Sequence, residues 1–532
     1  MIRKGLSMGR KALLGFAAAT AVLVAGSPAR AEWLRAESEH FVVYGRSEAL
    51  VREYAAMLED FDDLLRRLHG RLQDEAAPRK LPVYVISDLK QMQRVRPSAK
   101  QGLAGAYFSG FPEVFVVANR NAGGDIDRNK GDDTVLHEYV HHFMLQYYPS
   151  AYPAWLVEGY AEYYMTVDLG LTRLVVGGYN EGRARTLTKP GSWIPMQDVL
   201  TKRPIQLKED RERYAYYAQA WLLTHYILTD PARKKLLASY LDAVRDGRDP
   251  VKAWQDVYGD DIEGLTRKLY GYMGGRLPAF ALSRTGSGAP PMTVTRLSPG
   301  ADDLILEGQR LKLGVGKDDR PQFLEQIRAA AARHPTDWFS RLILARAETT
   351  YGDRAAGEAI LNDLLTADPK DEEALVALGE SKLAASRSDP AQKAANLAQA
   401  GKLFARAFKV NPDNPETLHG YADARALEPV TESLADIRVR AVVLAPQIGH
   451  LRLDAARTLI QIKDLEMART ILNPLATSPH GGAEAAAAQA MLKSIDAKGA
   501  GADTGVVSEG ADAAVPSTTN ASGEGDKAAS GS

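Results

Sequence analysis

Apolar and polar residues near the amino terminus follow two different spacings, which predict both helices and strands. Between residues 48 and 72, apolar positions such as Leu50 and Tyr54 recur every three or four residues, as on one face of an amphipathic helix. Short apolar or aromatic segments bounded by turn residues have the length typical of strands. The strands predicted in this way cover residues 41–44, 81–86, 104–108 and 114–118. We therefore expect an α+β domain at this end of the chain.

The last two of these strands flank Ser109-Gly110-Phe111-Pro112, a sequence typical of a hairpin turn. A strand at the exposed edge of a sheet can bind an extended peptide by strand addition. Residues 114–118 are our candidate for such an edge strand, and an interior position in the sheet is the alternative.

Two further helices are predicted on either side of a short segment that contains two prolines. The first helix, over residues 134–147, begins after the polar residues Asp132 and Asp133 and ends before Pro149. The second opens at Pro153, because proline fits the first turn of a helix. The helices expected to complete this domain cover residues 211–228, 231–246 and 261–273.

The second half of the chain carries a repeating pattern of helix pairs. Between about residues 321 and 497, stretches rich in Ala and Leu, such as 338–350 and 355–365, come in pairs. The prolines between these pairs are separated by 34, 43, 34 and 33 residues: Pro335, Pro369, Pro412, Pro446 and Pro479. The longest interval contains residues 386–390, which predict a loop insertion of about nine residues. A period of 34 residues resembles tetratricopeptide repeats, an all-α solenoid that commonly binds peptides or proteins. A purely structural helical stack is the alternative.

Composition marks two further segments. Residues 284–320 begin with a run rich in Gly, Ser and Pro, and we expect them to link the domain of residues 32–283 to the repeats of residues 321–497. Residues 498–532 consist mostly of Gly, Ala, Ser, Thr and Asp and contain no aromatic residue. Such a segment cannot bury enough apolar surface to fold, so we expect a disordered tail.

Residues 1–31 have the pattern of a secretory signal. Five basic residues and no acidic residue surround an apolar run from Leu13 to Ala25, which is too short to cross a bilayer. Ala29-Arg30-Ala31 is a suitable cleavage sequence, and an uncleaved anchor is the alternative. We therefore expect export to the periplasm or the outer surface of a bacterial cell, with no transmembrane anchor after cleavage.

The overall composition is that of a globular protein with more than one domain. The 532 residues are 45% hydrophobic and 25% charged, with a net charge of −1. Without the basic leader the chain is mildly acidic, which gives no reason to expect nucleic acid as a partner. The absence of cysteine excludes disulfides, a lipoprotein anchor and thiolate metal ligands.

The strongest chemical signal is the sequence His-Glu-Tyr-Val-His at residues 137–141. Residues four apart share a helix face, so His137 and His141 can bind one ion through their imidazoles. Glu138 lies beside them and can take a proton from a water molecule that the ion activates. Glu158, on the second predicted helix, offers a third ligand. Three protein ligands and one open position describe a catalytic Zn²⁺ site, whereas a structural site is closed.

Together with Trp-Leu-Val-Glu-Gly-Tyr-Ala-Glu-Tyr at residues 155–163, this motif resembles the gluzincin metallopeptidases, and most closely the bacterial peptidase-MA-like group. The resemblance covers about Glu39 to Met273. It implies a zincin-like α+β domain that binds zinc through the three ligands named above and uses Glu138 as general base. A sheet with an exposed edge strand before the motif helix also belongs to the gluzincin arrangement.

The resemblance adds two residues to the expected site. It implies that Glu162, one turn beyond Glu158, orients a ligand imidazole. An ordinary solvated helix residue is the alternative for Glu162. Gluzincin aminopeptidases use a downstream tyrosine to stabilise the oxyanion, and Tyr217 fits that pattern best. An aromatic side chain packed in the core is the alternative for Tyr217.

Two functions are consistent with these features. The Gly-x-Met-Glu-Asn motif of gluzincin aminopeptidases and the Asn-Glu-x-x-Ser-Asp helix of thermolysin are both absent, and endopeptidase action is favoured over aminopeptidase action. We expect an exported zinc metallopeptidase whose repeats bind a protein substrate or another protein partner. The alternative is a catalytically inactive scaffold that acts through its repeats. The motif alone also permits hydrolysis of a non-peptide amide.

Overall fold

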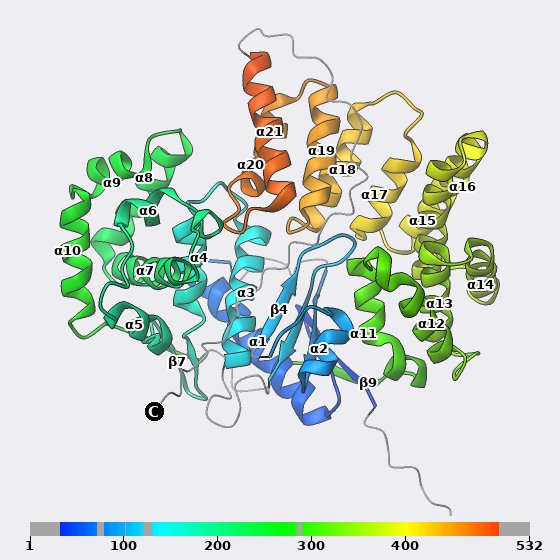
Figure 1. Ribbon diagram of the computed structural model, residues 1–532, viewed down its shortest axis with the longest axis horizontal. Coiled ribbons are helices and arrows are strands. Elements are labelled where there is room, and N and C mark those ends of the chain that lie inside the picture. Colours follow the sequence, from blue (N-terminus) through cyan, green and yellow to red (C-terminus); the bar gives the residue numbers. More distant parts are fainter. Residues whose placement is uncertain (1–31, 72–78, 102, 121–129, 285–289, 500–532) are drawn as a thin grey trace, which may run out of the picture.

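The computed structural model combines an amino-terminal sheet with a mostly helical carboxyl-terminal region (Figure 1). It describes residues 32–71, 79–101, 103–120, 130–284 and 290–499. The expected signal, residues 1–31, and nearly all of the expected tail, residues 498–532, lie outside this range. The expectation of an α+β part followed by a helical part is confirmed at this coarse level.

The main sheet is built from six strands. Their bounds are β1 (Leu34–Glu37), β2 (Phe41–Gly45), β3 (Leu81–Ile86), β4 (Gly105–Phe108), β5 (Phe115–Asn119) and β9 (Thr293–Arg296). They lie in the order β4-β5-β3-β2-β1-β9. β2, β3 and β5 are parallel to one another, whereas β4 is antiparallel to β5, and β1 is antiparallel to both β2 and β9. β2 to β5 lie where the apolar pattern predicts them.

Helices surround this sheet and a smaller one. The smaller sheet consists of β6 (Asp168–Leu169), β7 (Arg173–Val176) and β8 (Phe280–Ser283). The helices of this part are α1 (Glu48–Leu68), α2 (Leu89–Val95), α3 (Lys130–Tyr147), α4 (Ala154–Tyr164), α5 (Glu181–Thr188), α6 (Met196–Thr201), α7 (Asp210–Leu228), α8 (Pro231–Arg245), α9 (Pro250–Tyr258) and α10 (Ile262–Met273). All the helices predicted from the apolar pattern are present here, although α3 begins at Lys130, four residues before the predicted start.

The two faces of the main sheet are covered by different helices. Alternate residues of each strand point to opposite faces. Val83 and Val116 belong to the core that α1 and α3 share, whereas their neighbours Tyr84 and Val117 belong to the core beside α2. Helix α1 is fixed at its start by Ser47, whose side chain accepts a hydrogen bond from the first turn, and it buries one apolar face.

The edges of the main sheet are β4 and β9, so the expectation of an edge strand at residues 114–118 is wrong. β5 pairs in parallel with β3 on one side and antiparallel with β4 on the other, which makes it an interior strand. The hairpin places its first strand outermost. The motif helix α3 packs closely against this edge, since a Cβ at Gly105 would lie 3.3 Å from a side-chain carbon of Thr134.

The segment expected as a linker contains a strand and a helix. β9 pairs with β1, with Leu34 opposite Arg296. Helix α11 (Pro299–Leu313) then packs on the sheet face that carries α2, where Asp302 accepts a 2.7 Å hydrogen bond from the backbone N–H of Trp33. The local composition concealed this arrangement because the partner residue lies 269 positions earlier in the chain.

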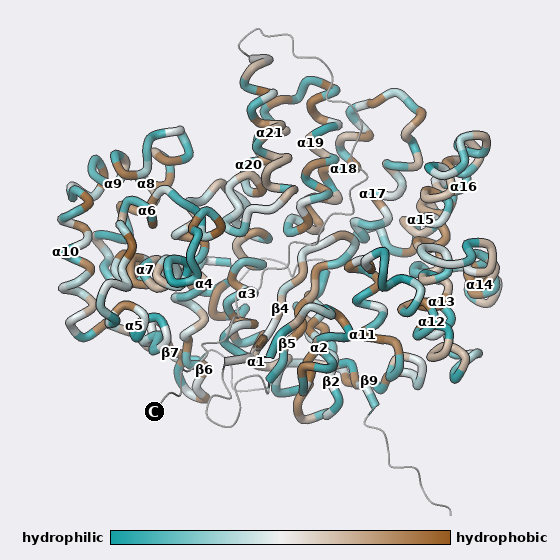
Figure 2. Tube along the Cα trace, in the orientation of Figure 1, coloured by the Kyte–Doolittle hydropathy of each residue, from teal (hydrophilic) through white to brown (hydrophobic). Residues whose placement is uncertain are grey.

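The carboxyl-terminal region is a series of helix pairs. Its helices are α12 (Arg320–Ala331), α13 (Trp338–Tyr351), α14 (Arg354–Ala367), α15 (Glu372–Ser388), α16 (Lys393–Val410), α17 (Pro415–Ala424), α18 (Glu432–Leu444), α19 (Gly449–Gln461), α20 (Leu465–Ala476) and α21 (Gly482–Gly499). All five spaced prolines lie in the connections that precede α13, α15, α17, α19 and α21. Brown and teal alternate along these helices in Figure 2, as expected where one side of each helix is buried.

The extra residues of the longest repeat extend helices instead of forming a loop. α15 has 17 residues and α16 has 18, whereas α13 and α14 have 14 each. The predicted loop at residues 386–390 is therefore wrong for its first part, because Ser386 and Ser388 continue α15. Asp389 then caps that helix, and a single 3₁₀ turn leads to α16.

The last helix pairs return to the sheet-containing part. α20 and α21 lie near α3 in Figure 1, and Gln447, just before α19, donates hydrogen bonds to the backbone oxygen of His142 at 3.3 Å and to Gln146 at 3.2 Å. The amino-terminal part and the end of the helical region are thus in direct contact. Across the described part of the chain, no helix combines the length and apolar character needed to cross a membrane.

Candidate metal centre

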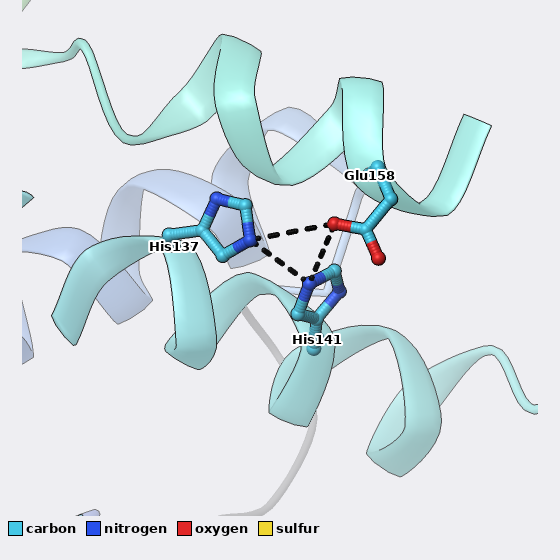
Figure 3. Close-up of side chains that lie close together, drawn as sticks. All are labelled: His137, His141 and Glu158. Carbon is cyan, nitrogen blue, oxygen red and sulfur yellow. Dashed lines mark hydrogen bonds and ion pairs between the residues drawn. The ribbon is translucent and has the colours of Figure 1, made fainter. Parts of the chain in front are cut away.

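Helices α3 and α4 bring two imidazoles and one carboxylate to a common point (Figure 3). The Nε2 atoms of His137 and His141 are 3.1 Å apart, and each lies 3.6 Å from Oε2 of Glu158. The two histidines are one turn apart on α3, and Glu158 reaches them from α4 on the other side. All three residues are buried. The predicted ligand set is therefore assembled in the fold.

The spacing of these atoms suits a small metal ion. Ligands held tetrahedrally at about 2.0–2.1 Å from an ion lie about 3.3–3.4 Å from one another. Neither oxygen of Glu158 has a hydrogen bond among the described residues, although the residue is fully buried. A buried carboxylate without hydrogen bonds is costly unless a positive charge lies beside it. The three side chains can therefore hold a metal ion.

The charges around the site favour a positive ion. Burial alone would lower the pKa of His137, but the interaction with Glu158 and the charges of Glu162 and Glu138 outweigh it and raise that pKa. Burial would likewise raise the pKa of Glu158, yet the neighbouring histidines, His480 foremost, hold it well below its usual range. Glu158 is therefore ionised at neutral pH, and the imidazoles lie in a negative field.

Glu138 is enclosed in the same space. It follows His137 on α3 and is only 1% exposed. Burial and then the charge of Glu138 raise the pKa of Tyr107 on β4 well above its usual value, and the same charge acts on Tyr217 of α7 and on His480. A buried carboxylate beside metal-binding side chains is placed to exchange a proton with a water molecule in that space.

Glu162, one turn after Glu158, is fully hydrogen-bonded. Arg183 donates to both of its oxygens at 2.6 and 2.9 Å, and Asn180 donates a third hydrogen bond at 3.2 Å. Its Oε1 also lies 3.6 Å from Nδ1 of His137, the ring nitrogen that does not face Glu158. A carboxylate in this position can fix the orientation of the imidazole. The alternative of a solvated helix residue is wrong, because Glu162 is 1% exposed.

Tyr217 lies on α7 at the side of the site where Arg183 is found. Its ring centre is 5.2 Å from the guanidinium carbon of Arg183. Burial and then the negative charge of Glu158 raise the pKa of Tyr217 well above its usual value, so the hydroxyl keeps its proton at neutral pH. The side chain is half-buried. Tyr217 is thus a protonated hydrogen-bond donor near the candidate metal ligands.

A close contact between α4 and α7 sets the position of Glu158. A Cβ at Gly159 would lie 2.2 Å from Oγ1 of Thr224 and 2.3 Å from the backbone oxygen of Ala220. Only glycine permits such an approach. The Glu-Gly pair in the motif therefore joins a ligand to the residue that lets its helix pack against α7.

The sequence did not reveal His480, which lies in the connection between α20 and α21. Its Nε2 is 3.3 Å from Oε1 of Glu158, and its ring centre is 5.7 Å from that of His141. Burial is the main cause that lowers the pKa of His480. A single histidine after Pro479 carries no local signal of this role. The same holds for Arg183, which no motif connects to Glu162.

A cavity of about 120 Å³ opens beside His141. One side of it is formed by β4, α3, α4 and their connections, and the other by α19, α20, α21 and the segments that precede α19 and α21. Most of the lining is apolar or aromatic, and the residues that illustrate this are Tyr107, Met144, Tyr148, Val157 and Leu475. A substrate that reached the metal-binding side chains through this cavity would therefore touch both regions of the molecule.

The comparisons with known proteins assign no family to this chain. The sequence matches no protein-family model, and no curated protein matches it either. The expected residues that the structure brings together are His137, Glu138, His141, Glu158 and Glu162. Tyr217 lies near them through Arg183.

Proposed function

We propose that this protein is an exported zinc-dependent metallopeptidase that acts as an endopeptidase. The observation that carries the proposal is the convergence of His137, His141 and Glu158 at 3.1–3.6 Å, with the buried carboxylate of Glu138 beside them. Two imidazoles and one carboxylate are the donor set of many hydrolytic zinc sites, which keep one position open for water. On this proposal the sheet-containing part has a gluzincin-like fold.

The chain's own residues would share the work of peptide hydrolysis. A bound zinc ion would supply Lewis acidity and lower the pKa of a water molecule. Glu138 accepts the proton of the attacking water and then passes it to the nitrogen of the leaving amine. Tyr217, which keeps its proton, donates a hydrogen bond to the carbonyl oxygen as negative charge develops there. Glu162 and Arg183 hold the imidazole of His137 in place.

We further propose that the carboxyl-terminal helices are tetratricopeptide-like repeats that recruit a protein substrate or partner. Regular helix pairs, with a proline in every connection that precedes a new pair, support this assignment. The last pairs also contribute to the cavity beside His141. A segment bound along the repeats would therefore end close to the metal-binding side chains.

The decisive experiment compares the purified protein with its Glu138→Gln variant. Cleavage of casein and of a quenched-fluorescent peptide library is measured together with the zinc content of each protein. We expect cleavage to fall by about 100-fold or more while zinc content stays the same, because the variant loses the proton acceptor but none of the ligands. Glu263→Gln, on an exposed position of α10, is the matched control and should retain full activity.

Two other results would contradict the proposal. A zinc-loaded wild-type protein without cleavage of either substrate would favour the scaffold function of the repeats. Equal cleavage by wild type and Glu138→Gln would show that Glu138 is not the general base.

A further inference from the structure

A second group of metal-ligand side chains lies between α17 and α19. His419 on α17 faces His450 and Asp454, which are one turn apart on α19. Oδ2 of Asp454 lies 3.2 Å from Nε2 of His450 and 3.7 Å from Nδ1 of His419. The ring centres of the two histidines are 5.2 Å apart. His419 is buried and Asp454 is half-buried, whereas the side chain of His450 is 42% exposed, so the group lies at the margin of the helical region.

The spacing of these atoms is close to that of the first site. Tetrahedral zinc ligands lie about 3.3–3.4 Å apart, and Zn²⁺ accepts imidazole nitrogen together with carboxylate oxygen. The two distances between imidazole nitrogen and carboxylate oxygen are 3.2 and 3.7 Å here, and both are 3.6 Å in the candidate metal centre. The two groups also have the same composition, two histidines and one carboxylate.

Two of the atoms that would not touch an ion already have partners. Nε2 of His419 lies 3.5 Å from Oδ2 of Asp423, and Arg438 holds the other oxygen of Asp423 at 2.9 Å. Arg457 forms an ion pair with Oδ1 of Asp454. Partners of this kind orient metal ligands in known sites. They leave Nδ1 of His419 and Oδ2 of Asp454 facing the same space.

The turn between β4 and β5 covers this group. The ring of Phe111 lies 4.8 Å from that of His419 and 5.7 Å from that of His450. An apolar ring beside the two imidazoles helps to bury that of His419, whereas His450 stays 42% exposed. It also means that an ion bound here would fix α17 and α19 where they meet the sheet-containing part.

We propose that His419, His450 and Asp454 form a second zinc site, which joins α17 and α19 beneath the β4–β5 turn. The proposal does not depend on the peptidase function, because none of these residues belongs to the first site. Nη1 of Arg438 lies 3.9 Å from Oδ2 of Asp454, and its positive charge opposes the ion. The second site therefore binds zinc more weakly than the first.

The test counts zinc in the purified protein after removal of metal, dialysis against Zn²⁺ and desalting. The wild type should hold two zinc ions per chain. The double variant His419→Ala/His450→Ala should hold one, and so should His137→Ala/His141→Ala. A variant with all four changes should hold none. His334→Ala, which changes a histidine outside both groups, is the control and should hold two.

The variants distinguish failure of the second site from failure of the first. One zinc ion in the wild type, lost in His137→Ala/His141→Ala, would overturn the second site and leave the proposed peptidase intact. If the wild type holds one zinc ion and only His419→Ala/His450→Ala loses it, the second site is supported and the first site is overturned as a zinc site. Asp454→Asn tests whether zinc is lost because the fold is damaged. If this variant, without metal, has the same unfolding temperature as the wild type but binds only one zinc ion, the loss comes from the missing ligand and the second site stands. Retention of two zinc ions by Asp454→Asn and by the double variant would overturn it.

Discussion

Two clusters of histidine and carboxylate lie in the sheet-containing part, and they differ in whether their polar atoms are already hydrogen-bonded. In the cluster around His40, Nδ1 is 2.7 Å from Oε2 of Glu59, whose other oxygen accepts the backbone N–H of His40 at 2.8 Å. Asp62 in the same cluster accepts hydrogen bonds from Tyr139 at 2.6 Å and from Arg66 at 2.7 Å. These carboxylates are fully used by the protein itself.

The cluster of His137, His141 and Glu158 also combines imidazole with carboxylate, but it has two histidines and one carboxylate, whereas the cluster around His40 has one histidine and two carboxylates. Its atoms are 3.1–3.6 Å apart, and Glu158 has no hydrogen bond among the described residues. A separation of 2.7 Å holds a shared proton, whereas one of 3.6 Å is too long for a hydrogen bond and suits a central ion. Composition alone does not separate an ion pair from a metal site; the distances and the unused oxygens do.

Replacement of one carboxylate by an amide in each cluster should give the largest difference in zinc affinity. We expect Glu158→Gln to weaken zinc binding by about 100-fold or more, since a ligand is lost, and to leave the fold intact in the presence of metal. Glu59→Gln should leave zinc affinity unchanged and lower the free energy of unfolding by about 1–3 kcal/mol, because it disrupts a buried hydrogen-bonded pair. Both effects are measured in a His419→Ala/His450→Ala background, by zinc competition with a chelating dye and by urea unfolding. Equal zinc affinity of Glu158→Gln and Glu59→Gln would contradict the claim that only the cluster of Glu158 binds zinc.

Removal of His480 sharpens the description of the metal-binding cluster. His480 lies 3.3 Å from the oxygen of Glu158 that does not face His137 and His141, so it holds this carboxylate in one orientation. We expect His480→Ala to weaken zinc binding by about 10-fold, a smaller loss than that of a direct ligand. His334→Ala serves as the control. An unchanged affinity in His480→Ala would show that the helical region covers the site without positioning its ligands.

The cluster around His40 should respond to pH. Burial alone would lower the pKa of His40, but Glu59 and Asp62 outweigh burial and raise it. A raised pKa in the folded state means that the ion pair stabilises the fold fully below pH 6.5 and less as pH rises through the folded pKa. As pH rises from below 6.5 to 8.5, the wild type should lose unfolding free energy relative to His40→Gln. Parallel loss in both proteins, measured by urea unfolding with a chelator present, would contradict this account.

Whether a residue of the candidate site could be predicted depends on how far apart in the sequence its contacts lie. His137 and His141 could be assigned because helical periodicity alone places residues four apart on one face. Glu158 required only one more helix nearby in sequence. His480 and Arg183 could not be assigned, since they reach the site through packing between distant segments and carry no local pattern. Tyr217 lies beside Arg183, and its role in stabilising an oxyanion stays a prediction.

The fold shows the same limit. The lengths of β2 to β5 and of the helix pairs follow from apolar spacing, which is a local property. The prediction of an edge strand at residues 114–118 was wrong because the order of strands depends on long-range pairing. β5 pairs with β3, and this leaves β4 at the edge of the sheet. β9 and α11, within residues 284–320, were not predicted, because a Gly- and Pro-rich run precedes β9 and the pairing partner of β9 is the first strand of the sheet in chain order.

The pairing of β9 with β1 has a consequence for the newly made chain. Residues 34–37 are synthesised early, but residues 293–296, which cover their outer edge, follow only after the metal-binding helices α3 and α4 are complete. Until then β1 presents an unpaired strand edge, which is open to pairing with other chains. The sheet under the candidate metal centre is therefore closed late in synthesis, and a product that stops before residue 293 would carry His137, His141 and Glu158 on an aggregation-prone sheet.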